Sequence, residues 1–370
     1  MIDNLSILKQ KIDFALKQNI PFVSYRKPFF DEITFITQKN PKLNYLENYS
    51  QKGFVFAPFD TSAKTILFPL DQCENSTFRI QHSEFSIQNS EFNNQYLDKE
   101  KHLKLVKKGI DFIKKTTVKK IVLSRKETFE QPNFNAIQTF LKLLQNYKNA
   151  FVYIWYHPEI GLWLGATPET LVQIKNNNFK TMSLAGTQEY INTLAVTWQE
   201  KEIQEQKYVT DYIVNELTNL KIDCKSDNAT TIKAGNLLHL CSDISGRISS
   251  KQTSGLIIKA LHPTPAVCGL PKEDAKQFIL ENENYKREFY TGFLGELNFE
   301  ESRKSNRKNI ENQAYKLHQK TSNLFVNLRC MQVNKSEINL YIGGGITAES
   351  NPEKEYIETV IKSKTIKKCL

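Results

Sequence analysis

Apolar residues recur at helical or strand spacing along most of the chain, and the pattern predicts a mixture of both element types. Residues 1–18 place leucine and isoleucine on one helical face, whereas several later segments are short, aromatic-rich and bounded by turn residues. The predicted elements are, in order, a helix over 1–18, strands at 21–25 and 54–57, a helix from about 103, a strand over 120–124, a helix near 134–147 and two aromatic strands around a turn at 157–161.

Several predicted strand pairs lie close together in the sequence, with helices between them. This order favours an α+β fold with mostly antiparallel sheets over a doubly wound parallel sheet. A chain of 370 residues has room for two to three average domains or for one large domain.

Two polar stretches interrupt the pattern. Residues 72–100 nearly repeat a seven-residue unit and are interpreted as an exposed excursion or an edge strand. Residues 298–322 are crowded with Glu, Lys, Arg, Asn and Gln, which is typical of a solvated insertion with some helix.

The composition, with 40% hydrophobic and 24% charged residues, is that of a globular protein and excludes collagen-like and wholly disordered chains. The net charge of +10 is compatible with nucleic acid, an anionic surface or a small acidic substrate. No nucleic-acid motif accompanies the charge, so no nucleic-acid partner is expected.

No apolar run is long enough to span a membrane, and the first residues lack a secretory signal, so a cytoplasmic location without membrane contact is expected. The six cysteines are scattered without a C-x-x-C pair, which indicates reduced thiols.

Two pairs of acids are candidates for chemistry. In the helix after Trp198, Glu202 and Glu205 extend an apolar stripe, so they either point inward or are solvated acids of the first turn. Near the C-terminus, Glu355 and Glu358 share a helical face with Lys362. Four carboxylates on two helices would suit Mg²⁺, which prefers oxygen ligands.

The second acidic helix has clear start signals and follows a glycine run. Asn351 is a plausible N-cap, with Pro352 at the first helical position. The preceding strand, 338–342, leads into Gly343–Gly345, which is predicted to be a turn, either an ordinary one or one whose bare backbone approaches an anion.

Seven motifs in one order resemble the chorismate-utilising enzymes, and among them the isochorismate synthases. The similarity covers roughly residues 101–366, and the first hundred residues match only in general character. Residues 1–100 are therefore assigned to the N-terminal part of the same fold, and 101–370 to the chorismate-binding catalytic region. The motifs are Lys120–Arg125, Gly165–Glu169, Leu184–Thr187, Leu261–Gly269, Gly292 with Gly295, Leu328–Cys330 and Glu355–Thr359.

The resemblance implies one large domain of two stacked, mostly antiparallel sheets surrounded by helices, with a Mg²⁺-dependent site between the sheets. It implies conversion of chorismate to isochorismate, in which water adds at C2 and the C4 hydroxyl leaves. Lys120 is then the base that activates water, and Glu169 is the acid that protonates the leaving hydroxyl. Burial favours the neutral form of both side chains.

The remaining site residues also follow from the resemblance. Glu205 and Glu358 would hold the metal, with Glu202 and Glu355 in support. His239 is either a substrate-binding residue or a satisfied core histidine, and His262 is interpreted as structural. The expected substrate-binding residues are Gly186, Thr187, His239, Arg329, Gly345 and Lys362.

Within the family, salicylate synthase is the alternative activity, because it makes isochorismate before eliminating pyruvate. Anthranilate and aminodeoxychorismate synthases are less favoured, since the former usually have glutamine where Lys120 stands and both tend to carry a Leu-Glu-Ser motif that this chain lacks. The expected partner is chorismate alone, without a glutaminase subunit, and the expected state is a monomer or weak homodimer. Menaquinone and siderophore biosynthesis both remain open as destinations of the product.

Overall fold

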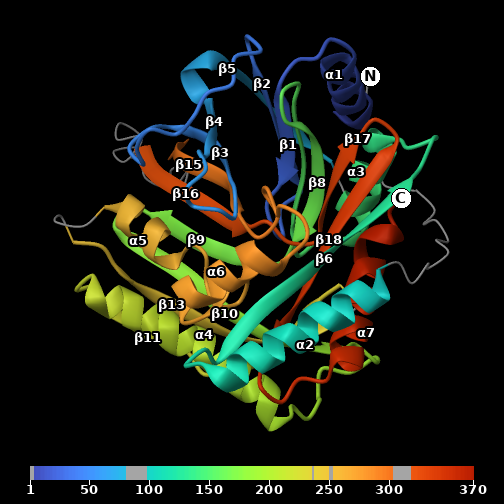
Figure 1. The fold of residues 1–370 in the computed structure, drawn as a ribbon. Helices are drawn as coiled ribbons and strands as arrows, with labels where there is room; N and C mark the ends of the chain where they lie inside the picture. The colour runs from blue at the N-terminus through green and yellow to red at the C-terminus, as the bar shows by residue number, and fades with distance from the viewer. Residues whose placement is uncertain (1–3, 81–97, 236, 250–252, 303–317) are drawn as a thin grey trace.

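Two antiparallel sheets face each other, and helices cover their outer surfaces (Figure 1). The computed structural model describes residues 4–80, 98–235, 237–249, 253–302 and 318–370. All pairings between the strands in these ranges are antiparallel. The predicted α+β architecture is therefore confirmed.

The first sheet has the strand order β14-β6-β18-β17-β8-β7-β1-β2-β5. Its strands are β1 (Phe22–Arg26), β2 (Glu32–Gln38), β5 (Cys73–Arg79), β6 (Lys120–Glu130), β7 (Phe151–His157), β8 (Gly161–Thr167), β14 (Gly269–Leu270), β17 (Cys330–Asn334) and β18 (Glu337–Ile346).

The second sheet has the order β11-β13-β10-β9-β16-β15-β3-β4, and β12 also pairs with β13. Its strands are β3 (Gly53–Ala57), β4 (Ile66–Pro69), β9 (Thr170–Lys175), β10 (Asn178–Glu189), β11 (Cys224–Ser226), β12 (Thr230–Ala234), β13 (Leu237–Arg247), β15 (Phe293–Ser302) and β16 (His318–Val326). Strands from the first hundred residues thus belong to both sheets.

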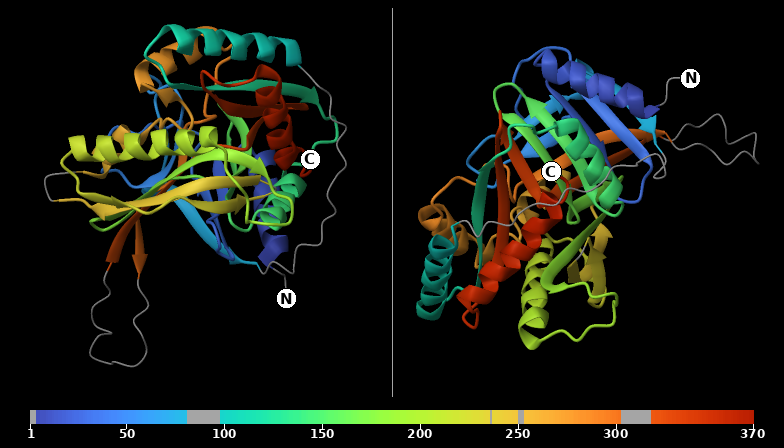
Figure 2. Two further views of the ribbon diagram at one scale, coloured as in Figure 1. Left: turned by 90° about the horizontal axis from the view of Figure 1, so that it is seen from below. Right: turned by 90° about the vertical axis from the view of Figure 1, so that its right-hand side faces the viewer.

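The helices bury apolar faces on the outside of the sheets. Helices α1 and α3 pack against the first sheet, α4 and α5 against the second, and α2 and α6 against β6. Figure 2 shows this arrangement from two further sides. The helices are α1 (Asn4–Lys17), α2 (Lys99–Lys115), α3 (Ala136–Asn146), α4 (Glu200–Asn219), α5 (Ser254–Leu261), α6 (Lys272–Asn282) and α7 (Pro352–Lys367), with a short 3-10 turn at Leu70–Gln72.

Aromatic side chains fill one part of the space between the sheets. Phe56 stacks on Phe289 with ring centroids 4.2 Å apart, and Phe151 stacks on Phe325 at 4.3 Å. The cluster takes residues from both sheets and extends to Tyr290 and Tyr341. Because large rings hold the sheets apart here, the part of the interface beyond them has room for a cavity.

The glycine run 343–345 does not form the predicted turn. Strand β18 continues to Ile346, and the three glycines pair with Ser124, Leu123 and Val122 of β6. The prediction was wrong because the ladder with β6 overrides the local turn tendency of glycine. A strand without side chains over three residues leaves the inner face of the sheet hollow at this point.

The two polar stretches have different outcomes. Cys73–Arg79 forms the edge strand β5, which confirms that part of the prediction, while residues 81–97 lie outside the described ranges. The described ends of the second stretch are strand, not helix, because β15 and β16 pair beyond residue 298. Residues 303–317 lie outside the described ranges.

Gly292 and Gly295 permit close approach of backbone, but not to a substrate. A Cβ on Gly292 would overlap the carbonyl oxygen of Ala57, and one on Gly295, where φ is +141°, would overlap that of Asn323. Neither glycine lines the main cavity. Their role is to let neighbouring strands pack closely.

A buried ion pair engages two backbone groups on the outer edge of β6, just beyond its short pairing with β14. Glu283 Oε1 accepts hydrogen bonds from the backbone N and the hydroxyl of Ser124, at 2.8 and 2.7 Å. Arg287 donates to Glu283 and also to the carbonyl oxygen of Val122 at 2.7 Å. Side chains thus satisfy edge groups that would otherwise await a further strand.

None of the helices in the described ranges is both long and apolar enough to cross a membrane. All six cysteines are free, as the sequence predicted.

Candidate active site

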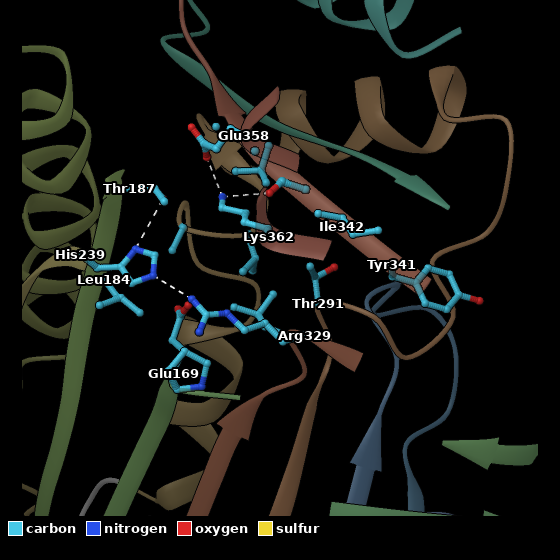
Figure 3. Close-up of a pocket in the computed structure, with 18 of the residues that line it drawn as sticks. Glu169, Leu184, Thr187, His239, Thr291, Arg329, Tyr341, Ile342, Glu358 and Lys362 are labelled. Atoms are coloured by element: carbon cyan, nitrogen blue, oxygen red, sulfur yellow. Dashed lines mark hydrogen bonds and ion pairs between the residues drawn. The ribbon is translucent and has the colours of Figure 1, made fainter. Parts of the chain in front are cut away.

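The main cavity lies between the sheets, beside the hollow that the glycine run leaves in β18. Its walls and rim are formed by strands β6, β8, β17 and β18 of the first sheet and by β10 and β13 of the second. Helices α4 and α7 lie beside it. Tyr290 and Tyr341 separate it from the aromatic core. Figure 3 shows polar and charged side chains from both sheets and from α7 converging on this space.

Glu169 reaches the cavity from the residues just after β8. It is only 4% exposed. Burial raises the pKa of Glu169 to about 8, even though the positive charges of Lys120, Arg329 and Lys362 act to lower it. At neutral pH this carboxyl group therefore carries a proton that it can donate.

Arg329 is held in place by two hydrogen bonds. Its Nη1 donates to the carbonyl oxygen of Ala234 at 2.9 Å, and its Nη2 lies 2.8 Å from Nε2 of His239 (Figure 3). Because a guanidinium group only donates, Nε2 of His239 must be the acceptor. The proton of this imidazole is then on Nδ1, which donates to the carbonyl oxygen of Gly186 at 2.7 Å.

His239 is consequently neutral and fixed in one tautomer. Burial and the charge of Arg329 lower its pKa to about 3. A histidine that holds its proton in this way orients the guanidinium group and does not exchange protons at neutral pH. The histidine lines the cavity, so it is at once a wall residue and a satisfied buried side chain.

Lys120 begins β6 and is completely buried, with an exposed fraction of 0%. Its Nζ forms an ion pair with Oε1 of Glu205 at 2.8 Å. Burial alone would raise the pKa of Glu205, but the charge and hydrogen bond of Lys120 hold it below its usual value. Lys120 does not itself line the cavity, whereas Glu205 does.

The other three predicted acids lie in the same region on α4 and α7. Glu355 pairs with Lys201 at 2.7 Å, and Glu358 pairs with Lys362 at 2.7 Å. Burial and the neighbouring charge of Glu358 raise the pKa of Glu355. The oxygen Oε2 of Glu202 is buried and has no hydrogen-bond partner among the described residues.

The glycine run provides the common meeting point of these acids. A Cβ on Gly344 would lie 3.7 Å from oxygens of both Glu355 and Glu358. A Cβ on Gly345 would overlap Oε1 of Glu205 and lie 3.0 Å from Cε of Lys120. The bare backbone therefore lets carboxylates from two helices approach one stretch of β18.

This donor set fits a hard divalent cation. It consists of carboxylate oxygens, and one of them, Oε2 of Glu202, is buried without a hydrogen-bond partner among the described residues. Glu358 also lies close enough for its negative charge to raise the pKa of Glu355. Within the described ranges, no three His, Cys, Asp or Glu side chains are grouped closely enough to hold a metal as they stand. Three of the four acids, Glu205, Glu355 and Glu358, form ion pairs with separate lysines.

The structure brings the predicted residues into one region, though not all into the cavity wall. Nine of them line the cavity, namely Glu169, Gly186, Thr187, Glu205, His239, Arg329, Gly345, Glu358 and Lys362. Lys120, Glu202 and Glu355 lie behind this wall. His262 is outside it and is held by the carbonyl oxygen of Pro58 at 3.1 Å, in line with a structural role.

Sequence reasoning missed Lys201, Tyr290 and Thr291. Lys201 pairs with an acid 154 positions away, so nothing local identifies it. Tyr290 and Thr291 line the cavity and precede a recognised glycine, and the aromatic character of Tyr290 was the only available signal.

Comparison with known proteins gives these residues a context. The sequence profile described as "Chorismate binding enzyme" matches residues 55–303 and 315–370. The chain belongs to this family. The match begins well before residue 101, so part of the N-terminal hundred residues carries the family pattern as well.

Individual relatives within the family are distant but extend along the chain. The vibriobactin-specific isochorismate synthase of Vibrio cholerae is 25% identical over 98% of this chain and 88% of its own length. The isochorismate synthase DhbC of Bacillus subtilis is 27% identical over 72% of this chain and 66% of its own length, just under two thirds. The solved structure of MenF, the menaquinone-specific isochorismate synthase of Escherichia coli, shares the fold with a TM-score of 0.75 at 20% identity, covering 95% of this chain and 89% of that one.

Proposed function

We propose that this protein is an isochorismate synthase, which converts chorismate to isochorismate by adding water at C2 and releasing the C4 hydroxyl. Family membership and the named relatives support the substrate and the reaction class. The observation that carries the proposal is Glu169, a buried carboxyl group with a pKa of about 8 inside the family's cavity.

The reaction needs one acid and one base. A hydroxide is a poor leaving group, so the C4 oxygen must receive a proton as its bond to carbon breaks, and Glu169 is the group that holds one at neutral pH. We assign to Lys120 the removal of a proton from the attacking water. This role requires the unprotonated amine of Lys120, because an ammonium group cannot accept a proton.

The substrate carries two carboxylates, and the cavity offers cationic groups for them. We assign this task to Arg329 and Lys362, because a guanidinium group can bind both oxygens of a carboxylate at once. His239 keeps the guanidinium in orientation. The backbone at Gly186, Thr187 and Gly345 lines the same space and would contribute polar contacts.

Magnesium is the cofactor that the family relationship suggests. We assign Glu205 and Glu358 as its ligands, with Glu202 and Glu355 in support. When bound, the ion would supply positive charge to a substrate carboxylate and so favour the charge redistribution of the ring.

The test is chromatographic analysis of chorismate incubated with purified protein and Mg²⁺, with and without ammonium. Isochorismate should form in both cases and approach an equilibrium with chorismate, without a glutaminase. Salicylate with pyruvate as the main products would assign the chain to the salicylate synthases. An aminated product that depends on ammonium would assign it to the anthranilate or aminodeoxychorismate branch.

The base is tested separately with Lys120→Ala. This variant should lose at least about a hundredfold in turnover, since general base catalysis typically contributes that much. Mg²⁺ binding, followed by calorimetry, should persist because the four acids remain. A nearly normal rate in Lys120→Ala would contradict the role assigned to this residue.

A further inference from the structure

A second cavity, with a volume of about 480 Å³, lies along the free edge of β6 between α2 and the chain that follows α6. In Figure 1, α2 runs alongside β6 and next to α7. This cavity shares no wall residue with the active-site cavity. Its walls are Asp98, Lys101, His102, Lys104, Leu105, Lys108, Ser124, Arg125, Lys126, Thr128, Asn282, Asn284 and Tyr285.

The walls carry a strong excess of positive charge. Five Lys and Arg residues face a single acid, Asp98, which pairs with Lys101 at 2.8 Å. Lys104, Lys108 and Lys126 have no acid within ion-pair distance in the part of the chain that the structure describes. Cations that gather in a concave site without counter-charges raise the local concentration of anions.

Arg125 adds a buried positive charge to the wall of this cavity. It is only 4% exposed, yet its Nη2 has no hydrogen-bond partner among the described residues. Its Nε donates to Thr359 Oγ1 at 2.7 Å, and its Nη1 pairs with Glu127 at 2.5 Å. Glu127 is shared with Lys367, at 2.6 Å, so this one carboxylate faces two cations.

His102 adds another unsatisfied group to the same wall. Its Nδ1 is buried without a described partner, and the ring lies against Tyr356 with centroids 6.1 Å apart. Burial and the charge of Arg125 lower the pKa of His102 to about 4, so the ring is neutral and can donate one hydrogen bond. Both atoms are inaccessible to solvent, so Arg125 and His102 shape the wall, and the exposed lysines of α2 carry the charge that an anion can reach.

We propose that this cavity binds a phosphorylated small molecule or an inorganic polyphosphate through its phosphate groups. A phosphate has several oxygens and more than one negative charge, which suits the lysines that line this cavity. The neutral polar side chains of Asn282 and Asn284 can accommodate the rest of an organic ligand. The site is independent of the chorismate reaction and does not rest on it.

Isothermal titration of the full-length protein with pyrophosphate, in Mg²⁺-free buffer at physiological salt, tests the site. The double variant Lys104→Gln/Lys108→Gln removes two wall charges from exposed positions and should weaken binding about tenfold. The matched control is Lys107→Gln/Lys114→Gln, which removes two exposed charges of α2 outside the cavity. The control should change the affinity by less than about twofold.

The outcomes are distinct. Equal loss in both double variants would reveal diffuse attraction to α2 and overturn the proposal, as would absence of pyrophosphate binding by the wild type. Unchanged binding in both would place pyrophosphate in the active-site cavity and also overturn it. If duplex DNA competes with pyrophosphate and binds more tightly, the ligand of this cavity is nucleic acid and the proposal of a small phosphorylated ligand is wrong.

Two further measurements refine the result. Parallel titrations with inorganic phosphate and with ATP distinguish an inorganic ligand from a phosphorylated metabolite. All four lysines substituted in the two double variants are exposed, so both variants are expected to fold.

Discussion

The protonated state of Glu169 makes a quantitative prediction about the pH dependence of stability. Its pKa rises from an ordinary value of 4.5 to about 8 on folding because the side chain is buried. Below pH 4.5 both the folded and the unfolded chain hold the proton, so this group contributes no difference. Between pH 4.5 and 8 the unfolded chain ionises first, and the folded state loses about 1.4 kcal/mol per pH unit relative to it.

The accumulated penalty approaches about 5 kcal/mol at pH 8 and stays constant above it. In Glu169→Gln the side chain is neutral at every pH, so this slope disappears. The variant should therefore gain stability relative to the wild type as the pH rises from 5 to 8, and the gain should level off above pH 8. Glu100→Gln, at an exposed position, should run parallel to the wild type.

Urea unfolding of the wild type, Glu169→Gln and Glu100→Gln at pH 5, 6.5, 8 and 9 measures the effect. The quantity compared is the difference in unfolding free energy between each variant and the wild type. The wild type should also lose turnover above about pH 8, because its acid is then ionised. If wild type and Glu169→Gln stay parallel within about 1 kcal/mol across this range, burial does not hold the proton on Glu169 and the mechanism loses its acid.

Three other outcomes are expected. Gly345→Ala should lower turnover at least about a hundredfold, because the added Cβ would overlap Glu205 beside Lys120. Gly344→Ala should change turnover by less than about tenfold, because the nearest neighbours of its Cβ lie at 3.7 Å. Equal effects of the two substitutions would contradict the geometry of β18. His239→Gln should raise KM by about tenfold, because the hydrogen bond to Arg329 is lost, and should leave the pH profile of kcat unchanged. A shifted pH profile would show that the histidine exchanges protons during turnover. EDTA should stop turnover and added Mg²⁺ restore it, and full activity in EDTA would exclude the metal from the reaction.

The parts of the fold that the sequence predicted are those with strong local signals. Helix α7 begins where Asn351 and Pro352 indicate, and the Asn351 side chain accepts a hydrogen bond from the backbone N of Lys354 at 3.1 Å. In α4 the apolar stripe of Val209, Ile213 and Leu217 is buried. These features depend on residues a few positions apart, so a pattern in the sequence can identify them.

The parts that it did not predict depend on pairing across long distances. The glycine run in β18 is a strand because β6, some 220 positions earlier, continues alongside it. The pairing of Lys120 with Glu205 and of Lys201 with Glu355 is likewise set by how the sheets and helices stack. Motif similarity placed the acids in one region, but their individual partners required the three-dimensional arrangement.

The side-chain closure of the β6 edge has a consequence for association between molecules. Strand β6 carries Lys120, and just beyond β14 the backbone N of Ser124 and the carbonyl oxygen of Val122 are engaged by Glu283 and Arg287. A neighbouring chain therefore cannot pair with these two groups of the edge. Loss of Glu283 would leave the backbone N of Ser124 without its partner, so concentration-dependent self-association would be the first sign of damage at this edge.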